Sequence, residues 1–262
     1  MLRYWRLFWL FVRVSVQDST AYRMDFFAHV LVALLNVGAE ILGLWIIFSN
    51  TQAINTWGVY EMIALLGVFR TMTGIISMLI APNMRLLMED IREGRLDFVL
   101  LKPVNSQFYV SFRRVIVWRL IDILLGLMLI VVAIAKLRVS IGLSQVALFV
   151  VMLSAGAVII HSFWLVLGTL AFWLTRINNM EMVFWNVFEA GRYPVEIYRP
   201  SVRFSLTYVL PLAFITTFPA AALVGQTQAT GVVPAVLFAI ASFVAASSFW
   251  RYGLRHYSGA SA

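Results

Sequence analysis

Cysteine is absent from this chain of 262 residues, and charged residues account for only 12% of it. The lack of cysteine excludes disulfides, thiolate metal sites and a cysteine nucleophile. The charged fraction is well below the roughly one quarter that soluble domains carry, whereas hydrophobic residues make up 62% and the mean hydropathy is +0.89. This composition predicts an integral membrane protein with a single transmembrane domain, residues 1–262.

Motifs for chemistry are also missing. The three histidines belong to distant segments, and the sequence contains no H-E-x-x-H, no G-x-S-x-G and no G-x-x-x-x-G-K-[ST]. Without the last of these, the phosphate loop, the chain has no evident way to hold ATP phosphates. We therefore expect no catalytic residue, no metal site and no cofactor bound by this chain. A membrane enzyme acting on lipid or peptide would need a metal or nucleophile cluster that the sequence does not contain.

Six apolar stretches are each about as long as the ~20 residues that cross a bilayer. A spanning segment must satisfy its own backbone hydrogen bonds, and these runs lack the alternation of a membrane β-barrel. The sequence therefore predicts an all-α six-helix bundle. The expected spans are residues 26–48, 59–80, 115–135, 146–174, 206–224 and 232–250.

The orientation follows from the positions of the 20 Lys and Arg residues. Most of them fall before the first span, after spans two and four, and at the C-terminus, whereas the loops 49–57 and 225–231 carry none. Positive loops stay on the cytoplasmic side, so both termini are expected to be cytoplasmic. The protein is expected to be a multi-pass protein of the plasma membrane, which in a bacterium is the inner membrane. This topology and contact with anionic lipids explain the net charge of +8 without nucleic acid.

Residues 1–23 have the pattern of an interfacial elbow helix. At helical spacing, polar side chains share one face and large apolar ones lie on the others, as expected of a helix in the membrane plane. The alternative is that this segment extends the first span into the headgroups. The polar face consists of Arg3, Arg6, Arg13 and Gln17, and the apolar residues are Trp5, Phe8, Trp9 and Val12.

The loop 81–114 is predicted to be an ordered cytoplasmic coupling loop. Asn83 is expected to cap a short amphipathic helix after Pro82, and Gly94 to end it. A second apolar run, which includes Phe98, precedes Pro103 and is too short to span a membrane. By physical chemistry alone, this loop either packs under its own bundle or docks on a separate protein. The helix has an apolar stripe of Leu86, Leu87 and Ile91 and a charged cluster of Glu89, Asp90, Arg92 and Glu93.

Two stretches resemble permeases of the ABC type-2 exporter superfamily. The segment IREGRLDFVLLKP resembles their first cytoplasmic loop, with matching residues Arg92, Gly94, Leu96, Asp97, Lys102 and Pro103. The segment YPVEIYRPSVRFSLTYVLPLAFITTFP resembles a subfamily of small six-span permeases, with matching residues Tyr193, Pro194, Ile197, Tyr198, Pro211, Ala213, Phe214 and Pro219.

The resemblance implies a permease in which two such chains form the pathway and a dimer of cytoplasmic ATPases, holding ATP and Mg²⁺, drives transport. The second permease chain would be a copy or a relative, and the sequence does not separate these. Residues 84–93 would form the coupling helix. By this resemblance the ATPase-coupling residues are Met84, Leu87, Glu89, Asp90, Arg92, Glu93, Gly94, Arg95, Asp97, Lys102 and Pro103.

Four ionisable residues fall inside predicted spans, where an unpaired charge is costly. Glu40 and Arg70 lie in neighbouring antiparallel spans and are expected to form a buried ion pair; alternatively, Glu40 faces the pathway and recognises a cation. Asp122 is expected to meet Arg119 or a headgroup, and His161 to be a hydrogen-bonded packing residue. Intramembrane carboxylates also keep open an ion-coupled secondary transporter as the alternative function.

Residues 178–199 are only moderately hydrophobic. We place them as a second amphipathic element in the cytoplasmic interface, which would include Arg192, Tyr193, Pro194 and Tyr198. The alternative is that span five begins within this segment.

Overall fold

The computed structural model describes residues 2–20, 23–137, 142–174, 178–225 and 231–257. These residues form helices and, apart from one isolated bridge between Ile54 and Trp57, no β-structure. The all-α prediction is confirmed. The α-helices are α1 (Leu2–Thr20), α2 (Arg23–Asn50), α3 (Val59–Ile75), α4 (Ala81–Arg92), α5 (Leu96–Leu100), α6 (Ser106–Phe112), α7 (Leu120–Leu137), α8 (Leu143–Leu170), α9 (Asn178–Phe188), α10 (Pro200–Phe204), α11 (Phe218–Leu223) and α12 (Val232–Arg255).

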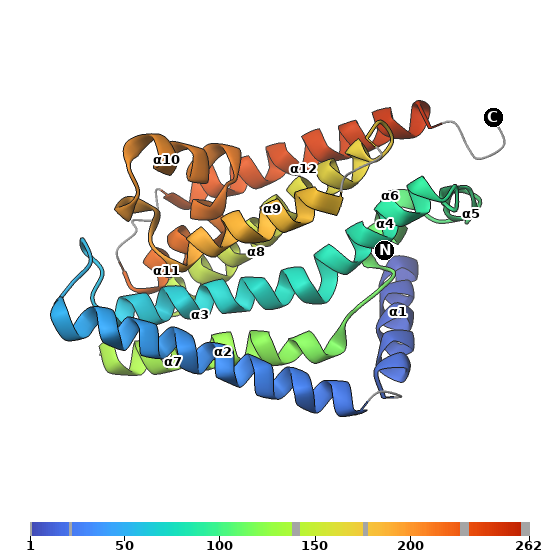
Figure 1. Cartoon of the computed structure of the whole chain (residues 1–262). Helices are drawn as coiled ribbons and strands as arrows, with labels where there is room; N and C mark the ends of the chain where they lie inside the picture. Colours follow the sequence, from blue (N-terminus) through green and yellow to red (C-terminus); the bar gives the residue numbers. More distant parts are fainter. Residues whose placement is uncertain (1, 21–22, 138–141, 175–177, 226–230, 258–262) are drawn as a thin grey trace.

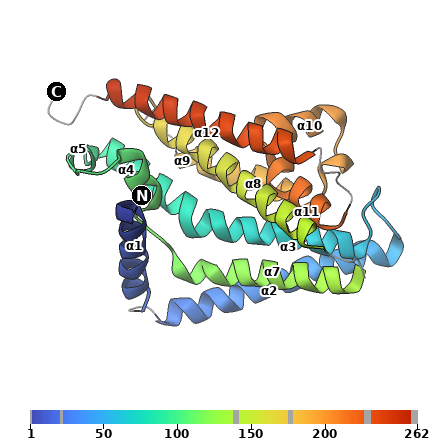
Figure 2. The same ribbon diagram turned by 180° about the vertical axis from the view of Figure 1, so that it is seen from behind.

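The long helices α2, α3, α7, α8 and α12 run along one common direction (Figure 1). Helix α1 lies crosswise at one end of this bundle, close to α4 and α5, and α12 also finishes at that end. We call this the α4–α5 end. The opposite end, the α10 end, carries α10 and the connection between α2 and α3, as the view from behind also shows (Figure 2).

Five helical segments of the described chain are long and apolar enough to cross a membrane. They are residues Phe26–Asn50, Val59–Arg92, Val117–Leu137, Leu143–Leu170 and Val232–Arg255. The span expected over residues 206–224 is not one continuous helix, because the chain there is bent by 75° between the segments Pro200–Val209 and Ala213–Leu223, which together are long and apolar enough for a sixth, broken span. Pro211 lies at the break and lacks a backbone N–H, and the preceding Leu210 has the non-helical angles φ −113° and ψ 87°.

The second span does not end at residue 80. It continues through a π-helical segment, Ile76–Ile80, directly into α4 and ends at Arg92. Pro82 cannot donate to the carbonyl of Met78, four residues earlier, and that carbonyl accepts a hydrogen bond from the N–H of Ile116 instead, at 2.9 Å. The expected cap at Asn83 is therefore wrong, because the helix is continuous there.

The centre of the core is α3, which is the most deeply buried of the membrane-length helices. It packs closely against α7 because glycines let the two backbones approach. A Cβ on Gly126 of α7 would lie only 2.6 Å from the carbonyl oxygen of Gly67 and 2.6 Å from the backbone nitrogen of Thr71. In contrast, α2 is mostly exposed, and its outer face is apolar.

Candidate functional site

Helix α4 is held to the bundle by two of the predicted ATPase-coupling residues. Met84 and Leu87 are completely buried, and they pack on α8 at Gly168, where an added Cβ would lie 3.0 Å from Leu87 Cδ2. These two coupling residues therefore join α4 to the bundle and present no surface to a partner. The spacing of Met84, Leu87 and Ile91 places all three on one helical face, and that face binds α8 rather than a partner.

Asp90 is also buried, with an exposed fraction of 6%. Its Oδ2 forms an ion pair with Arg113 Nη1 at 2.6 Å, and its Oδ1 accepts a hydrogen bond from Arg95 Nε at 3.2 Å. It therefore ties α4 to the segments that follow α4 and α6, and its place in the expected contact face is wrong. Gly94 ends α4 with φ +69°, a conformation that glycine adopts without strain.

The surface left at the tip is apolar with a charged border. Phe98 and Leu101 are 69% and 81% exposed, whereas Leu96 and Val99 on the opposite side of α5 are buried. The bordering side chains are Glu89, Arg92, Glu93 and Arg95, which are about half exposed. We call Phe98, Leu101 and these four residues the tip surface.

The remaining predicted coupling residues join the tip to its surroundings. Lys102 Nζ donates to Tyr109 Oη at 2.5 Å, and the carbonyl of Pro103 accepts from Arg3 Nη2 at 2.6 Å. Asp97 lies near the end of α12, where burial raises the pKa of the Tyr257 phenol and the negative charge of Asp97 raises it further. The tip is thus fixed to α6, α1 and the chain after α12.

Helix α1 packs on α6 through aromatic rings. The pairs are Tyr4 with Phe108, Phe11 with Tyr109 and Phe8 with Phe112, whose ring centroids are 4.9, 5.6 and 6.1 Å apart. Ser15 Oγ, farther along α1, accepts from the N–H of Val115 at 3.1 Å. Because of these contacts, a movement of α6 would carry α1 with it.

A charge cluster lies inside the bundle, where α2, α3 and α7 meet. Arg70 forms an ion pair with Glu40, and its Nη1 lies 3.5 Å from Asp122 Oδ1. Asp122 Oδ2 also lies 3.4 Å from Arg119 Nη1. The side chains of Glu40, Arg70 and Asp122 are each no more than 7% exposed, so every charge here is compensated by a neighbour rather than by solvent.

Arg192 does not lie in a cytoplasmic element with Tyr193, Pro194 and Tyr198. Its Nη2 lies 3.5 Å from Glu40 Oε1, and its Nε lies 2.5 Å from Glu189 Oε2. The chain then continues to the α10 end, where Asn55 Nδ2 donates to the carbonyl of Glu196 at 3.5 Å. The assignment is therefore wrong for residues 192–199, whereas Glu181 near the start of α9 does pair with Arg85 of α4.

A cavity of about 350 Å³ adjoins the cluster. Besides Arg70, Asp122 and Arg192, its lining includes the polar side chains of Asn36 and Thr73. The described part of the chain contains no group of three His, Asp or Glu side chains able to hold a metal ion. The arrangement is therefore an internally paired set of charges beside a polar cavity.

His161 of α8 is hydrogen-bonded, with Nε2 3.0 Å from Ser111 Oγ of α6. Its ring is nearly parallel to that of Phe112, with the centroids 6.1 Å apart. The histidine also lines a second, larger cavity. The spacing of residues along the chain gave no signal for this contact, because Ser111 belongs to a different element.

Comparison with known proteins identifies the family. A family model described as ABC-2 family transporter protein matches residues 34–261, which is most of the chain. The chain belongs to this family and is a multi-pass membrane component of an ABC transporter, a permease. A search of curated proteins found no matching relative.

Proposed function

We propose that this permease forms half of the substrate pathway of an ATP-driven exporter and couples to a separate cytoplasmic ATPase that holds ATP and Mg²⁺. The tip surface carries the proposal. Two large apolar side chains, Phe98 and Leu101, project from the end of the bundle among charged residues, and such a patch is typical of a protein-binding site. Family membership supports an ABC ATPase as the partner.

The same contacts provide a path for coupling. Helix α4 continues α3 without a break, it is anchored on α8 by Leu87, and α6 is joined to α1 by aromatic rings. A displacement of the tip surface would therefore move α3, α8 and α1 as packed bodies, which is how domain movements are transmitted. A second permease chain, a copy or a relative, would complete the pathway.

The α4–α5 end is proposed to be cytoplasmic. Arg199 and Arg203 belong to the basic residues after the fourth span, which the sequence predicts to be cytoplasmic, but they lie at the α10 end. Arg3, Arg92 and Arg113 are among the many basic residues that remain at the α4–α5 end, so the excess of positive charge still favours this orientation.

The test is co-purification of the ATPase from the native host in mild detergent. The double variant Phe98→Asp and Leu101→Asp should lose the ATPase, because two carboxylates would have to be desolvated in the interface. Leu143→Asp is the matched control, since Leu143 is 87% exposed and begins α8 at the end away from the tip. An ATPase that stays with the double variant at unchanged stoichiometry would refute the docking proposal.

The ion-coupled alternative has one observation in its favour, the polar cavity beside Glu40, Arg70 and Asp122. It requires that the permease transport without an ATPase. Transport by the purified chain in vesicles, driven by an ion gradient and indifferent to ATP, would support this alternative over the exporter.

A further inference from the structure

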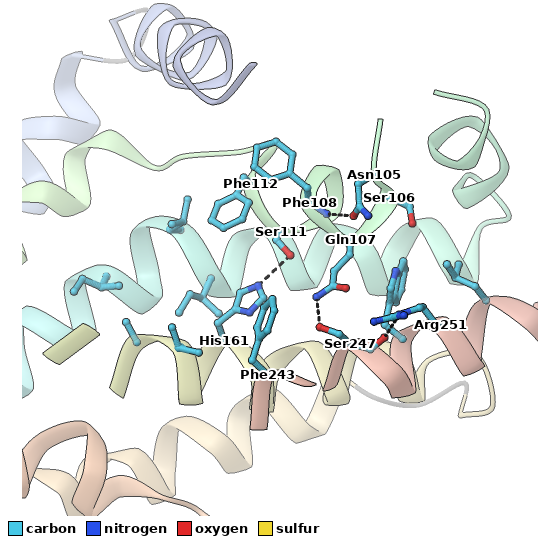
Figure 3. Close-up of a pocket in the computed structure, with 17 residues that line it drawn as sticks. Asn105, Ser106, Gln107, Phe108, Ser111, Phe112, His161, Phe243, Ser247 and Arg251 are labelled. Carbon is cyan, nitrogen blue, oxygen red and sulfur yellow. Dashed lines mark hydrogen bonds between the residues drawn. The ribbon is translucent and has the colours of Figure 1, made fainter. Parts of the chain in front are cut away.

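The larger cavity of the bundle lies between the end of α3, α6, α8 and the second half of α12 (Figure 3). Its volume is about 790 Å³, within the range of about 300–1,000 Å³ that is usual for small-molecule sites. Side chains from all four elements point into it, with polar groups toward Arg251 and aromatic rings around His161 (Figure 3).

The polar part of the cavity has an excess of hydrogen-bond donors. Arg251 Nε donates to the carbonyl of Ser247 at 3.3 Å, and among the described residues no carboxylate forms an ion pair with Arg251. Trp250 also lines the cavity, is 1% exposed, and its indole Nε1 has no hydrogen-bond partner in the described part of the chain. A guanidinium without a counter-charge beside an unpaired buried N–H favours an anionic acceptor.

Gln107 defines the orientation of the polar part. Its Nε2 donates to Ser247 Oγ at 2.8 Å (Figure 3), which joins α6 to α12 across the cavity. The wall that α6 provides is therefore attached on one side to α12 and on the other side, through Phe108, to α1. A movement of the coupling loop that shifts α6 would change the shape of this cavity.

The other part of the cavity is apolar and reaches the surface of the bundle. The rings of Phe112 and Phe243 lie on either side of His161, with centroid separations of 6.1 and 6.4 Å. Phe243 and Val158 line the cavity and are nevertheless 43% and 38% exposed. Both lie well inside membrane-length helices, so an apolar chain leaving the cavity here would enter lipid rather than water.

We propose that this cavity binds an amphipathic anion, with a phosphate or carboxylate headgroup at Arg251 and Trp250 and an apolar chain that passes His161 toward Phe243. The inference deepens the proposed function and rests on it for transport of this ligand. Binding itself does not need an ATPase. A membrane lipid and a transported amphiphile share this chemistry, and the experiment separates them.

The experiment measures equilibrium binding of radiolabelled palmitoyl lysophosphatidic acid to the full chain in phosphatidylcholine nanodiscs. Arg251→Gln should weaken binding about tenfold or more, as expected for the loss of a hydrogen bond to a charged group. Arg255→Gln is the matched control, because Arg255 lies one turn later on α12 and is exposed, as Arg251 is, but does not line the cavity. Equal weakening by both variants would overturn the site, since binding would then reflect surface charge alone.

Two unlabelled competitors test the headgroup and the chain separately. Monopalmitoylglycerol, which lacks the phosphate, should compete weakly and equally in Arg251→Gln and the unaltered protein. Glycerol 3-phosphate, which lacks the chain, should compete at least about tenfold more weakly than lysophosphatidic acid, because chain burial contributes about 0.8 kcal/mol per CH₂. Competition by glycerol 3-phosphate as strong as by the lipid would overturn the amphipathic assignment.

A second pair of variants tests the apolar part of the cavity. Val158→Trp should fill the cavity and weaken lipid binding, whereas Val151→Trp, two turns earlier on the same face of α8 and 42% exposed, should not. Size-exclusion elution verifies that both variants fold. Unchanged lipid binding by a folded Val158→Trp variant would refute the proposed path of the chain.

Native mass spectrometry of the protein from its own membrane identifies the source of the ligand. An anionic lipid that co-purifies with the unaltered protein and is lost in Arg251→Gln identifies a membrane lipid. A protein that purifies empty and then binds added lysophosphatidic acid identifies a transported amphiphile. If no anionic lipid co-purifies and added lysophosphatidic acid does not bind, this inference is overturned. Co-purification of the ATPase would still decide the exporter proposal independently.

Discussion

The side chain of Asn83 forms a closed pair of hydrogen bonds with the backbone of Arg114. Asn83 Nδ2 donates to the Arg114 carbonyl at 2.6 Å, and Asn83 Oδ1 accepts from the Arg114 N–H at 3.0 Å. The same Nδ2 also donates to the carbonyl of Leu79 at 2.6 Å. Completely buried at the start of α4, this amide holds the chain that returns from α6 against the helix that would transmit a movement of the tip.

Asn83→Leu is expected to lower the free energy of unfolding by about 1–3 kcal/mol, because it leaves backbone groups of Arg114 without partners. Thermal unfolding in detergent, followed by tryptophan fluorescence, measures the loss. Asn50→Leu is the control, since Asn50 is exposed at the end of α2 and its replacement should change stability by less than about 0.5 kcal/mol. Equal stability of the two variants would show that the hydrogen bonds between Asn83 and Arg114 contribute nothing to the free energy of unfolding.

Asp90 gives a second test of the coupling loop. Asp90→Asn removes the charge that Arg95 and Arg113 share, so the loop should open more often, and trypsin should cleave after Arg92 and Arg95 several times faster. Glu89→Gln should leave the cleavage rate unchanged, because Glu89 is half exposed and lies 3.9 Å from Arg95. If both variants were cleaved at the same rate, Asp90 would not be the residue that orders the loop.

We expect the stability losses caused by substitutions in the intramembrane charge cluster to be strongly non-additive. Arg70→Met leaves Glu40 with a single long contact to Arg192 at 3.5 Å, and it should cost about 3–5 kcal/mol. The double variant Glu40→Gln with Arg70→Met should be destabilised by less than the sum of the single variants. Urea unfolding in micelles measures each value, with the exposed Arg199→Met as the control. Strictly additive losses would mean that the pair does not interact energetically.

The sequence predicted most of the spans because hydrophobic length is a direct consequence of bilayer thickness. Pro211 within the fifth span is compatible with an interruption there, since proline removes a donor wherever it occurs. The 75° bend was not predictable, because its angle depends on packing against other helices. Nor was the continuity of α4 with α3, which depends on a donor from Ile116, far along the chain.

The candidate site was predictable where the signal was local, and also where two charges in neighbouring spans had to compensate each other, as Glu40 and Arg70 do. Gly94 was correctly identified as the end of its helix, since that role depends on its own backbone conformation. Arg192 was misplaced because its partner Glu40 is distant in sequence. One local signal was available in the sequence. Glu189 and Arg192 are three residues apart, a spacing that allows an ion pair on a helix. They follow an apolar segment, where such a pair would compensate both charges.

The close contact between α3 and α7 allows a prediction about stability. A Cβ on Gly126 would come within 2.6 Å of backbone atoms of Gly67 and Thr71, and backbone cannot move aside as a flexible side chain can. Gly126→Ala should therefore separate the helices and cost about 1–3 kcal/mol, with a lower Tm in detergent. Gly38→Ala on α2, where nothing lies within 4 Å of the new Cβ, should be neutral or slightly stabilising, since alanine favours helix. Because Asp122 and Arg70 face each other across this contact, Gly126→Ala should also weaken their coupling in a double-mutant cycle. A Tm equal to that of Gly38→Ala would contradict the close approach of α3 and α7.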